Sequence, residues 1–98
     1  MKLTHTPGPT AHTIAIEGSV DTVTAPELEA AIAALPDTLE RLILDFAAVD
    51  YVSSAGLRVL LAADQRLSAS GALILRNVNP DVREVFEMTG FDELLTLE

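Results

Sequence analysis

The first twenty residues alternate between apolar and polar positions in a way that predicts a β-hairpin. Strand-like sequence at residues 2–6 and about 11–17 flanks the turn former Pro-Gly-Pro. In the second strand Ile14 and Ile16 share one face, which is typical of a strand with one packed side. Gly18 breaks this alternation, so we expect residues 18–23 to form a connection.

Apolar residues recur at helical spacing in three later segments. The expected helices cover about residues 24–35, before Pro36-Asp37, then 53–70, before Gly71, and 79–90. Residues 24–27 fit a capping box at the start of the first helix, and Ser53 or Ser54 stands at the N-cap position of the second helix. Asn79 is the expected N-cap of the third helix, and Gly90 its end.

Two further strands alternate with these helices. Residues 39–46 are almost continuously apolar, which predicts a strand in the middle of the sheet that is buried on both faces, followed by a short polar turn. Residues 72–76 form another mostly apolar strand, and residues 91–98 fit either a helical turn or a last edge strand. A hairpin followed by alternating helix and strand predicts an α/β fold with a mixed sheet whose later strands are parallel.

Length and charge narrow the class of protein. Ninety-eight residues suffice for one packed core, so we expect a single domain over residues 1–98. The sequence has no cysteine, no signal-peptide core and no apolar run long enough to span a bilayer, which favours a cytoplasmic protein. A net charge of −9 argues against binding to nucleic acids or anionic membranes. It fits both plain solubility and recognition of a basic partner.

The sequence contains no recognisable catalytic, metal-binding or cofactor-binding motif. A hydrolase using Ser54 needs a nearby base, but the only histidines, His5 and His12, fall in the opening hairpin. The nucleophile-elbow pattern fails because Val52 stands where its first glycine is required. Phosphate-loop and metal-ligand spacings are absent as well. We therefore expect no enzyme, no metal and no cofactor.

The serine pair at the start of the second helix is the best candidate for chemistry. The first N–H groups of a helix lack intrahelical partners and lie at its positive end, so an anion such as a phosphoryl group is welcome there. The small residues Ala55 and Gly56 would let another protein approach the hydroxyl closely. The alternative is that the serine only caps the helix, as many serines do.

Three motifs, in order and at the right spacing, resemble the STAS domain of bacterial anti-anti-sigma factors. They are the turn at residues 18–21, the serine turn at residues 52–57, and residues 79–91. The resemblance covers nearly the whole chain. It implies a STAS-like domain with a mixed sheet of four to five strands, an antiparallel N-terminal hairpin and three to four helices.

The family's serine turn commonly reads Asp-Ser-Ser/Thr-Gly-Leu, and its phosphorylated serine matches Ser54. Ser53 stands in the place of the family's aspartate and is the second choice as phosphoacceptor, while Ala55 replaces the following serine or threonine. The resemblance further implies that Asp21, in the Gly-x-x-Asp turn, lies near the phosphoacceptor at the partner surface. For Asp21, an ordinary role in the turn is the alternative.

The resemblance implies an anti-sigma factor antagonist, which is a substrate and not an enzyme. Its expected partners are an anti-sigma factor that is also a serine kinase of the histidine-kinase-like ATPase type, and a metal-dependent serine phosphatase. Alone, we expect a monomer. The alternative is an unphosphorylated adaptor subunit of a transporter ATPase complex. The expected partner-binding residues are Asp21, Thr22, Val23, Ser53, Ser54, Gly56, Leu57 and Arg58, with Leu57 or Val23 as the exposed apolar member.

Overall fold

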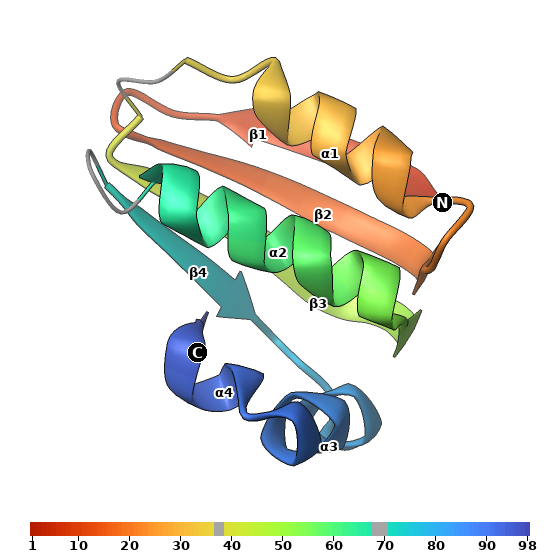
Figure 1. Ribbon diagram of the computed structural model, residues 1–98. Coiled ribbons are helices and arrows are strands. Elements are labelled where there is room, and N and C mark those ends of the chain that lie inside the picture. The colour runs from red at the N-terminus through yellow and green to blue at the C-terminus, as the bar shows by residue number, and fades with distance from the viewer. Residues whose placement is uncertain (37–38, 68–70) are drawn as a thin grey trace.

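Five strands form one mixed sheet in the order β1-β2-β3-β4-β5, in a computed structural model that describes residues 1–36, 39–67 and 71–98 (Figure 1). The strands are β1 (Lys2–Pro7), β2 (Ala11–Val20), β3 (Arg41–Val52), β4 (Ala72–Arg76) and β5 (Thr96–Leu97). The helices are α1 (Ala25–Ala33), α2 (Ser54–Leu67), α3 (Pro80–Thr89) and α4 (Phe91–Leu94). β1 and β2 are antiparallel, and the other neighbouring strands are parallel. The predicted fold class is confirmed.

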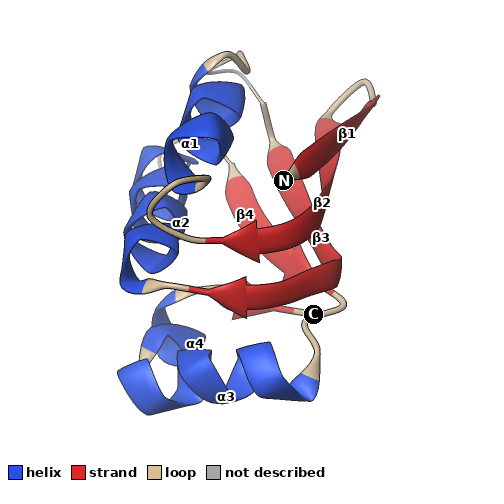
Figure 2. Cartoon of the chain, turned by 90° about the vertical axis from the view of Figure 1, so that its right-hand side faces the viewer, coloured by secondary structure: helices blue, strands red, loops and turns tan. Residues whose placement is uncertain are grey.

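The core lies between the sheet and its helices. Figure 2 shows α1 and α2 along one face of the sheet, with α3 and α4 at its far end. Leu42 and Leu44 of β3 are fully buried in the core, and Ile43, which points to the opposite face, is also buried. The predicted position of this strand in mid-sheet is confirmed. Burial on both faces holds only in part, because on the face of Ile43 the side chain of Arg41 is exposed and that of Asp45 is half-buried. Phe46 and Phe86 join α3 to β3, with ring centroids 6.3 Å apart.

Two strands continue further than the sequence predicts. β2 passes through Gly18 and ends at Val20, and β3 includes residues 47–52, which were predicted to be a turn. The pairing of β2 with β3 has irregularities between Ala15 and Glu17 and again between Gly18 and Ser19. Such bulges shift the alternation of side chains, so a strict period of two stops matching before the strands end. Gly18 tolerates its φ of 101° because it has no Cβ.

The helix boundaries agree with the predictions in part. Asn79 caps α3, its side-chain oxygen accepting a hydrogen bond from the Val82 N–H at 2.9 Å, and Gly90 ends α3 in the left-handed conformation. The capping box at Thr24 is wrong, because the Thr24 side chain makes no cap hydrogen bond. Helix α1 ends at Ala33, earlier than predicted. The predicted end of the second helix near residue 70, and Asp37, lie outside the described residues.

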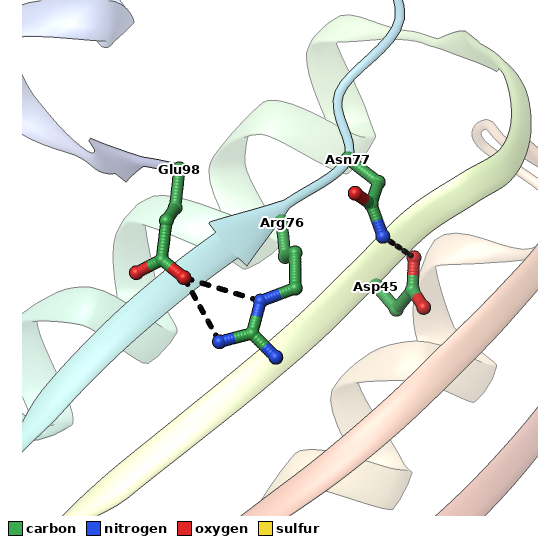
Figure 3. A network of polar contacts seen from close by, with 4 residues as sticks. All are labelled: Asp45, Arg76, Asn77 and Glu98. Carbon is green, nitrogen blue, oxygen red and sulfur yellow. Dashed lines mark hydrogen bonds and ion pairs between the residues drawn. The ribbon is translucent and has the colours of Figure 1, made fainter.

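The last eight residues form both of the structures that the sequence left open, since helix α4 is followed by the two-residue strand β5. Glu98 holds this end in place (Figure 3). Its backbone N–H donates to the Leu75 carbonyl at 2.7 Å, and its carboxylate accepts from the Arg76 guanidinium at 2.9 Å. Beside this pair, Asn77 donates to the Asp45 carboxylate at 3.1 Å.

The two edges of the sheet differ from its centre. The edge strand β1 carries Lys2, which lies 3.9 Å from the Glu17 carboxylate, and ends at Pro7. The opposite edge, β5, is only two residues long. Within residues 1–36, 39–67 and 71–98, none of the helices has both the length and the apolar character needed to cross a bilayer.

Candidate functional site

The candidate site lies where β2 and β3 end side by side. These strands are parallel neighbours, and their last pairs are Ser19 with Tyr51 and Val20 with Val52. The Ser53 N–H donates to the Val20 carbonyl at 2.8 Å, which ties the start of α2 to the end of β2. The turn before α1 and the turn before α2 therefore leave the same edge, where open α/β sheets usually carry their functional groups.

The two serines have different roles. Ser53 precedes α2 as its N-cap: its hydroxyl oxygen accepts from the Gly56 N–H at 3.3 Å, and its carbonyl accepts from the Leu57 N–H at 2.9 Å. Ser54 is the first helical residue and is exposed, and its hydroxyl makes no hydrogen bond to another described residue. The capping role therefore belongs to Ser53, and the Ser54 hydroxyl takes part in no structural hydrogen bond with another described residue.

Gly56 lets α2 approach the sheet. A Cβ at this position would lie 2.8 Å from both Cγ1 and the carbonyl oxygen of Val20, and 3.1 Å from Cγ1 of Val52. Gly56 is buried, so the expectation that it opens the site to a partner is wrong. Its small size serves the packing that fixes Ser53 and Ser54 at the ends of the two strands.

Asp21 organises the turn between β2 and α1. Its Oδ1 accepts from the N–H of Val23 at 3.0 Å, from the N–H of Thr24 at 3.0 Å and from the Thr24 hydroxyl at 3.1 Å. The Thr24 hydroxyl also lies 2.7 Å from the Ser19 carbonyl, to which it can donate. The backbone hydrogen bond from Thr24, followed by the weaker contribution of its hydroxyl, lowers the pKa of Asp21 although partial desolvation opposes the shift.

A shallow groove of about 400 Å³ runs beside Ser54, between α1 and α2. It is lined by Thr22, Ala25, Pro26, Glu29, Ala55, Arg58, Val59 and Ala62. The Arg66 guanidinium holds the two helices together at the other end, donating to the carbonyls of Ile32 and Leu35. The groove is mostly apolar, with one acidic and one basic side chain at its walls.

The predicted partner-binding residues do not all reach the surface. Thr22, Val23, Ser54 and Arg58 are exposed, and Asp21 and Ser53 are partly exposed. Val23 is 85% exposed. Leu57 is only 5% exposed and packs in the core, so the prediction that it contributes to a surface patch is wrong. Val23 is the exposed apolar member.

Sequence reasoning missed several residues around the site. Tyr51 is 54% exposed at the end of β3. The sequence allowed Asp50 to be either a turn former or a contact at the rim of the site; it lies in β3, not in a turn, and accepts from the Ser19 hydroxyl at 2.9 Å. The groove residues of α2 at positions 55, 58, 59 and 62 follow one helical face. That spacing was visible in the sequence, but only the neighbouring α1 shows that the face lines a groove.

The two histidines lie away from Ser54. His12 is the second residue of β2, so it stands near the opposite end of the strand from the site, and His5 is beside it on β1. Burial lowers the pKa of His12, and the neighbouring His5 lowers it further. Neither imidazole is placed to act as a base for Ser54.

Comparisons with known proteins agree on one family. The family model described as "STAS domain" matches residues 2–98. A Bordetella bronchiseptica protein with the provisional name anti-sigma factor antagonist BtrV is 49% identical over 78 residues, which are 78% of this chain and 67% of that protein. An anti-sigma factor antagonist from Mycobacterium paratuberculosis has a similar structure, with a TM-score of 0.87 and 29% identity over 98% of this chain and 83% of that one.

A third comparison is with the phosphorylated form of SpoIIAA, a Bacillus cell fate determinant. Its TM-score is 0.75 at 21% identity, over 99% of this chain and 91% of that chain. At this identity the likeness shows the shared fold alone.

Proposed function

Because the chain belongs to the STAS domain family, we propose that it is an anti-sigma factor antagonist whose binding is switched by phosphorylation of Ser54. The observation that carries the proposal is that the two serines have different structural roles. Ser53 caps the helix, so the exposed Ser54 hydroxyl can be modified without loss of a structural hydrogen bond. The name of the Bordetella relative supports the partner class, an anti-sigma factor.

In this proposal the chain is a substrate and not an enzyme. A partner serine kinase of the histidine-kinase-like ATPase type transfers the γ-phosphoryl group of ATP to Oγ of Ser54, and ADP and the hydroxyl proton leave. A metal-dependent serine phosphatase hydrolyses the ester and restores the hydroxyl. We propose the cytoplasm as the compartment, because sigma factors act there.

A phosphoryl group on Ser54 should not destabilise the fold, because Ser54 lies at the start of α2. The group adds about −1.5 to −2 charge at neutral pH, beside the N–H groups of Ser54 and Ala55 that have no intrahelical acceptor. The positive end of the helix dipole favours this charge. The switch therefore acts on the interface, where repulsion from nucleotide phosphates or acidic side chains of the kinase weakens binding; about 1.4 kcal/mol already gives tenfold release.

The surface proposed for the partner surrounds Ser54. It comprises the exposed side chains Thr22, Val23, Ser54 and Arg58, with Asp21 and Ser53 partly accessible beneath them. The groove between α1 and α2 opens next to them and offers a place for an apolar side chain of the partner.

The test is phosphorylation by the kinase-like anti-sigma factors of the same genome, followed by measurement of the intact mass. We expect one phosphate on the wild-type chain and on Ser53→Ala, and none on Ser54→Ala, which should still bind the kinase. Circular dichroism checks that both variants are folded. Phosphate on Ser54→Ala but not on Ser53→Ala would move the acceptor to Ser53. No phosphate with any kinase, together with stable binding to a transporter ATPase, would favour the adaptor function.

A further inference from the structure

The sheet brings together the two histidines, which are seven residues apart in the chain and distant from Ser54. In the antiparallel register His5 faces Ile14, and His12 faces Pro7, so both imidazoles project from the same face at the hairpin end of the sheet. Nδ1 of His5 lies 2.8 Å from Nε2 of His12, and the ring centroids are 5.1 Å apart. His5 is exposed and His12 is partly buried.

We propose that His5 and His12 form a two-imidazole binding site for a divalent transition-metal cation, Cu²⁺ in particular. Imidazole is a ligand that copper, nickel and zinc share, and among these the Irving–Williams order favours Cu²⁺. The site lies at the opposite end of β2 from Ser54, so it does not depend on the function proposed above.

The distance between the two nitrogens fits a tetragonal metal better than a tetrahedral one. With metal–nitrogen bonds of about 2.0 Å, a separation of 2.8 Å corresponds to an angle at the metal of about 90°. Tetragonal Cu²⁺ and Ni²⁺ place neighbouring ligands at this angle, whereas a tetrahedral Zn²⁺ needs the nitrogens about 3.3 Å apart. The separation of the two nitrogens therefore already suits Cu²⁺, and the rings need only rotate so that both lone pairs point at the metal.

Metal binding replaces the hydrogen bond between the two imidazoles by two metal–nitrogen bonds, and one N–H hydrogen changes its position. In the neutral pair one of the two facing nitrogens carries the hydrogen and the other accepts it. When the cation binds, that hydrogen moves through water to the other nitrogen of its own ring. Both facing lone pairs then coordinate the metal, and no net proton is released.

The proposed site is open to solvent, unlike a structural metal site in which protein side chains supply every ligand. Among residues 1–36, 39–67 and 71–98, no group of three or more histidine, cysteine, aspartate or glutamate side chains could hold a metal ion, so water completes the coordination. The Met1 amine lies at the other end of β1, about 13 Å along the strand from His5, and cannot join the site. Since β2 is hydrogen-bonded on both sides, His12 offers a fixed position, and a bound metal would cross-link it to the edge strand β1.

Titration of the full chain with CuCl₂ at neutral pH, in a buffer that does not bind metals, tests the proposal. We expect one Cu²⁺ per chain, with electron paramagnetic resonance showing two coordinated imidazole nitrogens. His5→Gln and His12→Gln should each weaken binding at least about tenfold and leave one imidazole nitrogen, because the chelate is lost. The matched control, Thr6→Gln, lies on the opposite face of β1 and should bind Cu²⁺ as the wild type does.

A second readout is the unfolding midpoint, which Cu²⁺ should raise for the wild type and Thr6→Gln but not for either histidine variant. If His5→Gln does not fold, His5→Thr, which suits an exposed strand, takes its place. Retention of wild-type affinity in both histidine variants would overturn the proposal and assign the metal to surface carboxylates. Spectra of the wild-type complex with one imidazole nitrogen, or none, would overturn it as well.

Discussion

Two adjacent serines carry separable properties at the start of α2. Replacement of Ser53 by Ala removes the N-cap hydrogen bond to Gly56 and should cost about 0.5–2 kcal/mol of unfolding free energy. Ser54→Ala, at an exposed position without such a bond, should change it by less than about 0.5 kcal/mol. Urea unfolding of the two variants measures this difference. The reverse order would show that Ser54 is the cap.

Asp21 makes stability depend on pH in a defined direction. Its folded pKa is lowered below the value of 3.8, so in that range the unfolded chain binds more protons than the folded one. The contribution of its charge is present above about pH 4 and is lost as the pH falls through the folded pKa.

We therefore expect Asp21→Asn to unfold at lower urea concentration than the wild type at pH 7, and the gap to narrow as the pH falls below about 4. Glu84→Gln is the control, since Glu84 is exposed and accepts no hydrogen bond from another described residue. A gap for Asp21→Asn that is constant from pH 7 to about 2.5 would mean that its charge does not stabilise the turn.

At the scale of elements, the contact between α2 and the end of β2 depends on Gly56. Gly56→Ala places a methyl group 2.8 Å from Val20 on a buried surface, and such overpacking typically costs about 1–3 kcal/mol. The midpoint of urea unfolding should fall accordingly. Combining it with Val20→Ala should give a smaller loss than the sum of the two single changes, because the crowded Cγ1 is removed, although the equally close Val20 carbonyl oxygen stays. Strict additivity would argue against this contact.

The type and order of the elements up to residue 90 could be predicted because each has a clear period or cap, such as the apolar run of β3 and Asn79 before α3. Residues 91–98 are too short and mixed for a period to decide between helix and strand. The ends of β2 and β3 could not, because bulges between Ala15 and Ser19 shift the side-chain alternation and only the paired strand reveals them. Helical spacing marks the start of α2, so the position of Ser54 at that start could be predicted. The burial of Leu57 could not, because it depends on the sheet against which α2 packs.

For the molecule as a whole, exposed apolar side chains in two different regions allow the docking surface to be tested. Val23 is 85% exposed beside Ser54, and Met88 is 79% exposed on α3. Val23→Asp should weaken binding of the kinase at least about tenfold, because it puts a charge where an apolar contact is proposed. Met88→Asp is the matched control and should bind normally. Normal binding of Val23→Asp with loss for Met88→Asp, measured by calorimetry, would move the docking surface to α3.

The edges of the sheet determine whether the chain associates at high protein concentration. Sheet edges with free N–H and C=O groups are templates for aggregation, and proteins protect them with lysine, proline or short strands. Here Lys2 and Pro7 stand on β1, and β5 offers only two residues. We therefore expect the chain to sediment as one monomeric species as its concentration rises. Lys2→Val should bring on association, since it removes the charge that a second chain would have to bury in extending the sheet.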